Sequence, residues 1–188
     1  MATDTLESVE VELNEATERA RRLVDGTDPR KFTVRPHPSS WSAAECIAHL
    51  SISTQLFLPV LRQALDDAKN RGVVENVKLS MDWIGAVLRW FLEPPVRSRV
   101  KTTAPFVPRA IRAKREAFAE FASLQEKLVD LLHESRGLDL RRTKIVSPFD
   151  KRVKYNVYSA FRIVAAHQRR HLWQAEQALT ALNMRKTA

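Results

Sequence analysis

Apolar residues recur at every third or fourth position along most of the chain, and this spacing marks four long amphipathic segments. In the first segment Asp4 and Glu7 can cap the start of a helix, and Gly26 can end it. The apolar seam between these signals consists of Leu6, Val9, Leu13, Ala16, Ala20 and Leu23. The pattern therefore predicts a first helix over these positions.

The start of the second segment is specified by four residues. Ser42 and Glu45 have the spacing of a capping box, and Trp41 and Cys46 occupy the two positions of a hydrophobic staple. We therefore expect the second helix to begin at Ser42. Pro59 lies inside it and predicts a bend, because proline removes one backbone hydrogen bond. The apolar seam is Ala43, Ile47, Leu50, Thr54, Phe57, Leu61 and Leu65.

The rest of the chain predicts one short and two long helices. The short helix covers about 81–92, and four prolines in 93–108 indicate an extended connection after it. A third long helix covers roughly 109–135, and the last covers roughly 156–183. The seam of the last helix is Val157, Phe161, Val164, Gln168, His171, Ala175, Ala178 and Leu182.

Composition supports one all-α domain over residues 1–188, a bundle of four long helices with one short extra helix between the second and the third. The chain is 44% apolar and has only 4 glycines. Its single cysteine excludes an intramolecular disulfide, and the N-terminus lacks the features of a secretory signal, so we expect a cytoplasmic protein. The most apolar segment, 81–95, is shorter than the roughly 20 residues of a membrane span. Hence no membrane partner is expected.

The net charge of +9 raises the question of an anionic partner. The basic clusters lie in several different elements, without interleaved aromatic residues or a nucleic-acid-binding motif. These observations disfavour nucleic-acid binding. A solvated surface, or a rim that attracts a small anionic substrate, explains the charge better.

Two histidines stand one turn apart near the middle of the last helix. His171 falls on its core-facing seam and His167 on the flank, whereas Arg162, Arg169 and Arg170 are expected to point outward. Imidazoles in a packed core need partners for both ring nitrogens. A metal ion would satisfy such a pair directly.

The third ligand should come from a facing helix, as in other helical bundles. His49 lies on the inner edge of the second helix, whereas His37 is in a proline-rich loop and His133 is near the exposed end of the third helix. His49, His167 and His171 are therefore the candidate metal ligands. Three neutral imidazoles suit zinc, nickel or ferrous iron and leave a coordination position open.

Four neighbouring residues have competing interpretations. Glu45 and Cys46 lie within a turn of His49, but each already has a structural role at the start of the second helix. Gln168 and Gln174 flank the histidine pair and are candidates for orienting a ligand or for ordinary hydrogen bonds in the bundle. The sequence leaves these roles open.

Two segments of the sequence resemble the DinB-like superfamily. They are WSAAECIAHL (41–50), similar to a W-S-x-x-E-x-x-x-H-L segment, and HQRRHLWQAEQAL (167–179), similar to an H-x-x-x-H-x-x-Q segment on the last helix. RVKTTAPFVP (99–108) also resembles the connection before the third helix in one branch. The resemblance covers the chain from about residue 5 to residue 183.

This resemblance implies a four-helix bundle with up-down-down-up connectivity and a metal triad at His49, His167 and His171. It further implies a small-molecule substrate and a metal-dependent transferase or isomerase that uses a low-molecular-weight thiol such as mycothiol, bacillithiol or glutathione; other members have been labelled hydrolases. The open position would activate a thiol or a water. Arg152 and Lys154 are candidates for holding the carboxylates of a thiol cofactor.

Two further function classes remain as alternatives: a non-enzymatic bundle that the metal stabilises, and a basic nucleic-acid-binding module. Association is a separate expectation. The apolar segment with Trp83, Trp90 and Phe91 should be covered by the bundle or by a second subunit, because exposed contiguous apolar surface favours association. Since members of the superfamily often pair, we expect a homodimer.

Overall fold

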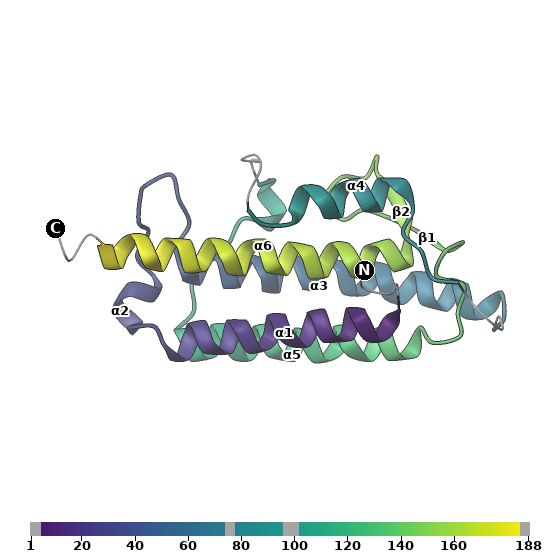
Figure 1. Ribbon diagram of the computed structural model, residues 1–188, viewed down its shortest axis with the longest axis horizontal. Helices are drawn as coiled ribbons and strands as arrows, with labels where there is room; N and C mark the ends of the chain where they lie inside the picture. The colour runs from purple at the N-terminus through teal and green to yellow at the C-terminus, as the bar shows by residue number, and fades with distance from the viewer. Residues whose placement is uncertain (1–4, 74–77, 96–101, 185–188) are drawn as a thin grey trace.

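A computed structural model describes residues 5–73, 78–95 and 102–184 of the chain. Four long helices lie side by side along its longest axis (Figure 1): α1 (Leu6–Asp25), α3 (Ala43–Asn70), α5 (Lys114–Glu134) and α6 (Val157–Met184). The shorter elements are α2 (Pro29–Phe32), α4 (Trp83–Leu92), the 3-10 helix η1 (Ala104–Phe106) and the strands β1 (Lys144–Val146) and β2 (Lys154–Asn156). The expected helical bundle, with its short extra helix α4 between α3 and α5, is confirmed.

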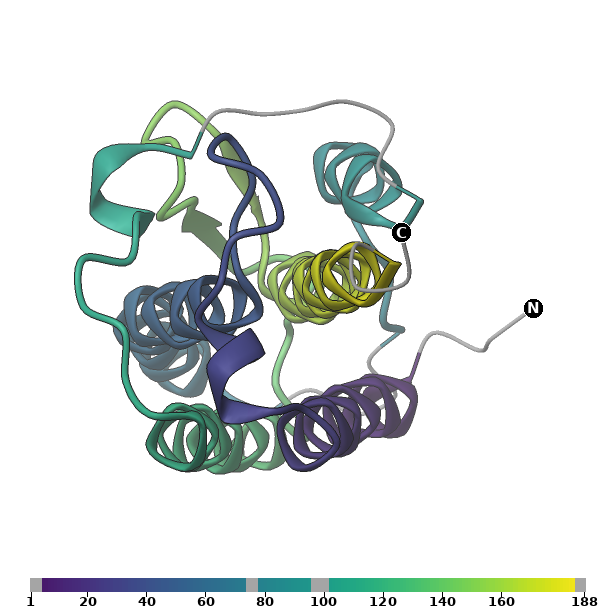
Figure 2. The ribbon, with the colours of Figure 1, turned by 90° about the vertical axis from the view of Figure 1, so that its left-hand side faces the viewer.

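The four long helices form a closed ring. α1 and α6 run in one direction and α3 and α5 in the other, which confirms the up-down-down-up connectivity (Figure 1). α3 packs against α5 and α6, and α1 packs against the same two helices (Figure 2). α4 lies outside this ring against α6, so α6 is enclosed by α1, α3 and α4. Accordingly, every residue of 157–168 is buried.

The helix starts and ends follow local capping chemistry. Thr5 caps α1, while the expected cap Asp4 lies outside the described residues, and Gly26 ends the helix as predicted. At α3 the capping box is confirmed: the Glu45 N–H donates to Ser42 Oγ at 3.2 Å, and the Ser42 N–H donates to the Glu45 carboxylate at 2.9 Å. These bonds fix the register of α3, and with it the position of each side chain one or two turns later.

Two local predictions differ from the structure. The third long helix, α5, begins at Lys114 rather than near residue 109, and its N-cap, Ala113, makes no side-chain capping bond. Of the connection expected to be extended, 96–101 lies outside the described residues and Ala104–Phe106 forms η1. The hairpin of β1 and β2, in which Ile145 pairs with Tyr155, was not predicted. Strands of three residues are too short to show an alternating pattern.

The prediction that the arginines of α6 point outward is wrong. Arg162 is 1% exposed and Arg170 8% exposed, because α1 and α4 cover this face of α6. Arg162 approaches the Glu12 carboxylate at 3.3 Å, and Arg169 contacts Glu12 at 3.0 Å and Glu93 at 2.5 Å. Arg89 of α4 joins the same carboxylates. We call Arg89, Arg162, Arg169, Glu12 and Glu93 the arginine cluster; it joins α1, α4 and α6.

α4 is only partly covered. Its inner face packs closely, since a Cβ atom added at Gly85 would lie 2.2 Å from Ser159 Oγ on α6. On the outer face Trp83, Val87 and Trp90 are 75%, 55% and 60% exposed. The expectation that the bundle covers this segment thus holds for one face. The homodimer stays a prediction.

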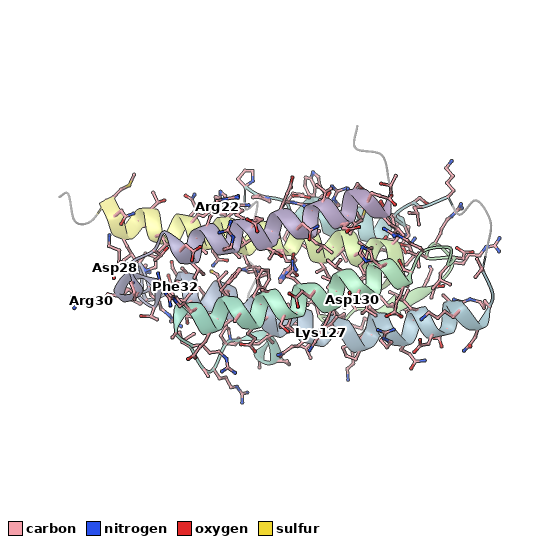
Figure 3. The ribbon with its side chains drawn as sticks, turned by 90° about the horizontal axis from the view of Figure 1, so that it is seen from below. Arg22, Asp28, Arg30, Phe32, Lys127 and Asp130 are labelled. Carbon is pink, nitrogen blue, oxygen red and sulfur yellow. The ribbon has the colours of Figure 1, made fainter. Side chains whose placement is uncertain are left out.

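The remaining surface and core follow ordinary burial rules. Charged side chains such as Lys127 and Asp130 lie on the outside of α5, while Phe32 of α2 is 1% exposed at the end of the bundle (Figure 3). α3 is long and apolar enough to cross a membrane by composition alone, but 61% of its apolar window is buried in the bundle. This burial is typical of a core helix.

Candidate metal centre

Three histidines meet where α3 packs against α6. His49 lies within the first two turns of α3, and His167 and His171 stand on successive turns of α6. One ring nitrogen of each lies within 4.8 Å of those of the other two. His49 is 2% exposed, His167 7% and His171 8%. The structure thus brings together the three residues that the sequence predicted.

Hydrogen bonding orients the His49 ring. Its Nδ1 lies 2.8 Å from the carbonyl oxygen of Phe106, and because a carbonyl can only accept, Nδ1–H is the donor. The lone pair of His49 is therefore on Nε2, which lies 3.2 Å from Nε2 of His167. A ligating histidine whose other nitrogen donates to a backbone carbonyl is the usual arrangement at protein metal sites.

One nitrogen of the cluster has no protein partner among the described residues. Nδ1 of His171 is buried and forms no hydrogen bond. A buried polar atom left without a partner costs about 1–3 kcal/mol, which is why such atoms are rare. Three convergent imidazoles, one of them with an unsatisfied nitrogen, fit the donor set of a transition-metal ion.

The surroundings keep all three imidazoles neutral. Burial lowers the pKa of His49, and the hydrogen bond to Phe106 opposes this shift. Burial first, then the charges of His171, His49 and Arg170, hold the pKa of His167 well below the usual range. Burial first, then the charges of His49 and Arg170, do the same for the pKa of His171. A hydrogen-bonding contact with the Gln174 side chain acts in the opposite direction and raises the pKa of His171. Neutral imidazole is the form that binds a metal.

Three aromatic rings lie against the histidines. The Trp41 ring is centred 4.9 Å from His49 and 5.9 Å from His171, and the Phe149 ring is centred 5.2 Å from His167. The Phe106 ring lies tilted against the Phe149 ring, with the two ring centres 4.5 Å apart. We call Trp41, Phe106 and Phe149 the aromatic collar. No sequence pattern placed Phe106 or Phe149 at the site, and Trp41 was assigned only to the hydrophobic staple.

Comparison with known proteins now identifies the family. The sequence model of the DinB superfamily matches residues 12–175, and this range contains all three histidines. The chain belongs to the DinB superfamily. No curated protein and no solved structure matches the chain significantly.

In this DinB protein Glu45 and Cys46 do not join the histidines. The Glu45 carboxylate accepts hydrogen bonds from Ser42 and Arg35, which keep its pKa low despite burial. Cys46 is fully buried, and burial raises the pKa of its thiol. Within the part of the chain that the structure describes, the group of side chains close enough to share an ion consists of the three histidines. Both residues therefore have structural roles.

The two glutamines differ. Gln168 exchanges hydrogen bonds with Gln125 of α5, at 3.1 Å and 2.5 Å, and so belongs to the contact between α5 and α6. Gln174 acts on the pKa of His171 and is the one of the pair that lies by the candidate site. The sequence could not separate them, because both are within a turn of a histidine.

The two basic residues suggested for cofactor binding lie in the β1–β2 hairpin region. Arg152 is exposed and pairs with Asp150 at 2.8 Å, and this contact lowers the pKa of Asp150 to about 2. Lys154 is exposed at the start of β2. The same turn carries Phe149 of the collar. A role of Arg152 and Lys154 in binding a thiol cofactor stays a prediction.

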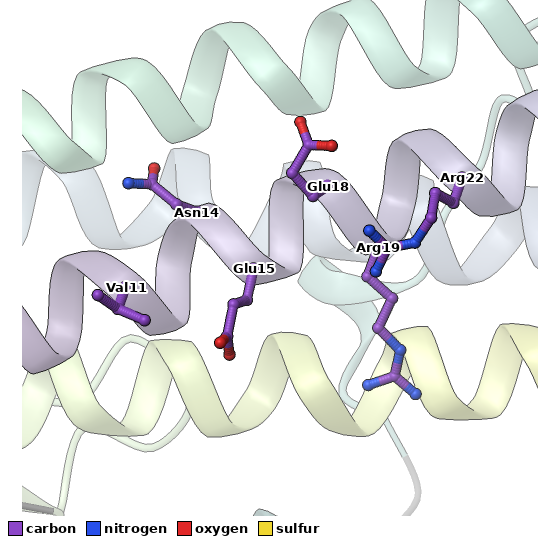
Figure 4. A pocket seen from close by; sticks show the side chains of 6 residues that line it. All are labelled: Val11, Asn14, Glu15, Glu18, Arg19 and Arg22. Atoms are coloured by element: carbon purple, nitrogen blue, oxygen red, sulfur yellow. The ribbon is translucent and has the colours of Figure 1, made fainter.

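A surface depression elsewhere does not involve the histidines. It lies along the outside of α1 and is lined by Val11, Asn14, Glu15, Glu18, Arg19 and Arg22 (Figure 4). Glu15 and Arg19 point toward α6, and Arg19 forms an ion pair with Glu176 at 2.6 Å. Its lining belongs to one helix face and brings no potential nucleophile or metal ligand set together. The histidine cluster remains the candidate site.

Proposed function

We propose that this DinB protein binds one divalent transition-metal ion through His49, His167 and His171 and uses it to transfer or isomerise a substrate with a low-molecular-weight thiol. The observation that carries the proposal is the convergence of three buried, neutral imidazoles, one of which has an unpartnered nitrogen. A purely structural cluster would be expected to satisfy its own polar atoms. Zinc, nickel and ferrous iron all accept such ligands.

The protein residues have separate tasks in this proposal. The bound ion would lower the pKa of a thiol that reaches its open position. The imidazoles hold the ion, and the Phe106 carbonyl keeps His49 in the tautomer that presents Nε2. Arg170, whose charge acts on both histidines of α6, makes the site favourable for an anionic thiolate. The collar limits the entry of water.

The test uses protein purified without an affinity tag and loaded with cobalt. We expect glutathione, mycothiol or bacillithiol to produce a sulfur-to-metal charge-transfer band, whereas the S-methyl form of the same thiol should not. His171→Ala should abolish the band, because it removes a ligand. His37→Ala is the matched control and should leave the band unchanged, since His37 is exposed and its side chain bonds to Ser39 in its own loop.

The alternatives predict other results. A hydrolase would show no spectral response to these thiols, but its metal-bound water would titrate near neutral pH. A metal that only stabilises the bundle would show neither response. Binding to DNA or RNA that weakens steeply with salt would support the nucleic-acid alternative.

A further inference from the structure

Three connections that are far apart in the sequence meet over the histidines. Trp41 precedes α3, Phe106 ends η1 between α4 and α5, and Phe149 lies in the turn between β1 and β2. In the view along the bundle these connections gather on the side of α3 and α6 that faces away from α1 and α5 (Figure 2). Each contributes one ring of the aromatic collar. The collar is thus built by several loops and does not result from the periodicity of one helix.

Each ring is held by contacts of its own loop. The loop of Trp41 is tied to α3 by the ion pair of Arg35 with Glu45. The backbone carbonyl of Phe106 accepts the hydrogen bond of His49. Phe149 donates its backbone N–H to Ser147 Oγ at 3.2 Å, and its ring packs on Phe57 at 5.4 Å. The rings are therefore in place before any ligand binds.

Two members of the collar remain accessible. Phe106 is 2% exposed and lies behind the site, whereas Trp41 and Phe149 are only half-buried. His167 and His171, which these two rings contact, keep some exposure as well. A molecule that approaches the histidines from outside the bundle thus meets the rings of Trp41 and Phe149.

The chemistry of this entrance favours one class of ligand. A polar group that leaves water for an aromatic wall loses its hydrogen bonds without replacement. An aryl or alkyl group gains from the same transfer, and ring-to-ring contacts add to that gain. The collar therefore favours molecules that carry an aryl or alkyl group close to the atom that enters the site over molecules that carry a polar group there.

We propose that the substrate of this site carries an aryl or bulky alkyl group within a few bonds of its reacting atom, and that Trp41 and Phe149 select that group. The inference rests on the proposed function, because it takes the three histidines to hold a metal that a thiol can reach. Polar parts of a larger thiol or substrate extend beyond the collar. Trp41 and Phe149 are specificity-determining residues in this proposal, and neither is a ligand of the ion.

The experiment compares two thiols that share a two-carbon chain, 2-phenylethanethiol and 2-mercaptoethanol, on the cobalt-loaded protein. The charge-transfer band reports only sulfur that reaches the metal. We expect the phenyl compound to bind about tenfold more tightly. Phe149→Ala and Trp41→Ala should each reduce this ratio to about threefold or less, while cobalt content and helix content stay unchanged. Phe149→Leu should retain part of the preference.

The matched control is Trp83→Ala, which removes a tryptophan that is 75% exposed on α4 and should leave the ratio unchanged. If Trp41→Ala does not fold, the affinity ratio of the two thiols in Trp41→Phe and in the two Phe149 variants still tests whether the rings select the phenyl group. Equal affinity for both thiols, or a preference that survives the loss of either ring, overturns this inference and leaves the proposed function standing. Absence of cobalt binding, or of a band with any thiol, overturns the proposed function itself.

Discussion

α6 carries two buried polar clusters that differ in how they are satisfied. On one side its arginines meet the carboxylates of Glu12 and Glu93, and on the other its histidines meet His49 of α3. Some nitrogens of the arginine cluster, such as Arg162 Nε, form no hydrogen bond, but every guanidinium faces an opposite charge. Each of the three arginines therefore has a carboxylate partner within the protein, although they share only two carboxylates.

The histidine cluster has no comparable counterpart. Two of its ring nitrogens face each other at 3.2 Å, and another is buried without a hydrogen-bond partner among the residues that the structure describes. Burial and the neighbouring charges disfavour protonation, so a counter-charge would not relieve the cluster as it does for the arginines. Burial alone therefore does not identify a site. What distinguishes the histidines is that an external cation would complete their bonding.

The largest effect on stability should come from breaking the arginine cluster. Glu12→Gln removes the carboxylate that Arg89, Arg162 and Arg169 share, and leaves the 1% exposed Arg162 without its charge partner. We expect the free energy of unfolding in urea to fall by about 3–5 kcal/mol, while metal binding per folded chain is unchanged. Glu18→Gln, on the exposed face of α1, is the control without measurable effect. Unaltered stability of the Glu12 variant would show that the cluster does not anchor α4.

The histidine cluster should respond to pH in the metal-free protein. The unfolded chain binds protons at these histidines near pH 6.5, whereas folding lowers the pKa of His167 and His171. The stability contribution is therefore complete above pH 6.5 and is lost as the pH falls. Between pH 7.5 and 5.5 the loss should be about 1.4 kcal/mol for each histidine that stays neutral.

Urea unfolding of the metal-free protein at both pH values measures this loss. The variant His167→Leu should show a weaker pH dependence, because one of the two groups is gone. His37→Gln should behave as the wild type. A free energy of unfolding that does not change between the two pH values contradicts the account of neutral, buried imidazoles.

A smaller effect should follow from crowding α4 against α6. In Gly85→Ala the new Cβ atom would lie 2.2 Å from Ser159 Oγ, so α4 has to shift outward. Overpacking of this kind costs about 1–3 kcal/mol, which thermal unfolding can detect. Ala86→Ser, at the exposed neighbouring position, is the control. If both variants melt alike, the close contact of α4 with α6 does not exist in solution.

The sequence predicted those features that depend on residues close together along the chain. The capping box of Ser42 and Glu45 fixed the start of α3, and the helical seams placed His49 and His171 on inner faces. From these two facts and the position of His167, the candidate triad followed. The DinB resemblance independently implied the same three residues.

The features that could not be predicted from the sequence depend on how segments that are distant along the chain pack together. Helical periodicity correctly identifies Arg162 and Arg169 as the polar side of α6, but it cannot show that α4 covers this side and that Glu12 comes from α1. The pairing of two glutamates with three arginines is visible only after folding. Phe106 and Phe149 likewise reach the histidines through a 3-10 helix and a hairpin of three-residue strands, which leave no periodic pattern.

We propose that His49, His167 and His171 together hold one metal ion. The direct measurement is elemental analysis of the untagged protein and its five single histidine-to-alanine variants after equilibration with zinc. We expect about one ion per chain in the wild type and in the variants His37→Ala and His133→Ala. The His49, His167 and His171 variants should show a sharp loss of the ion. Equal metal content in all five variants would contradict the proposal.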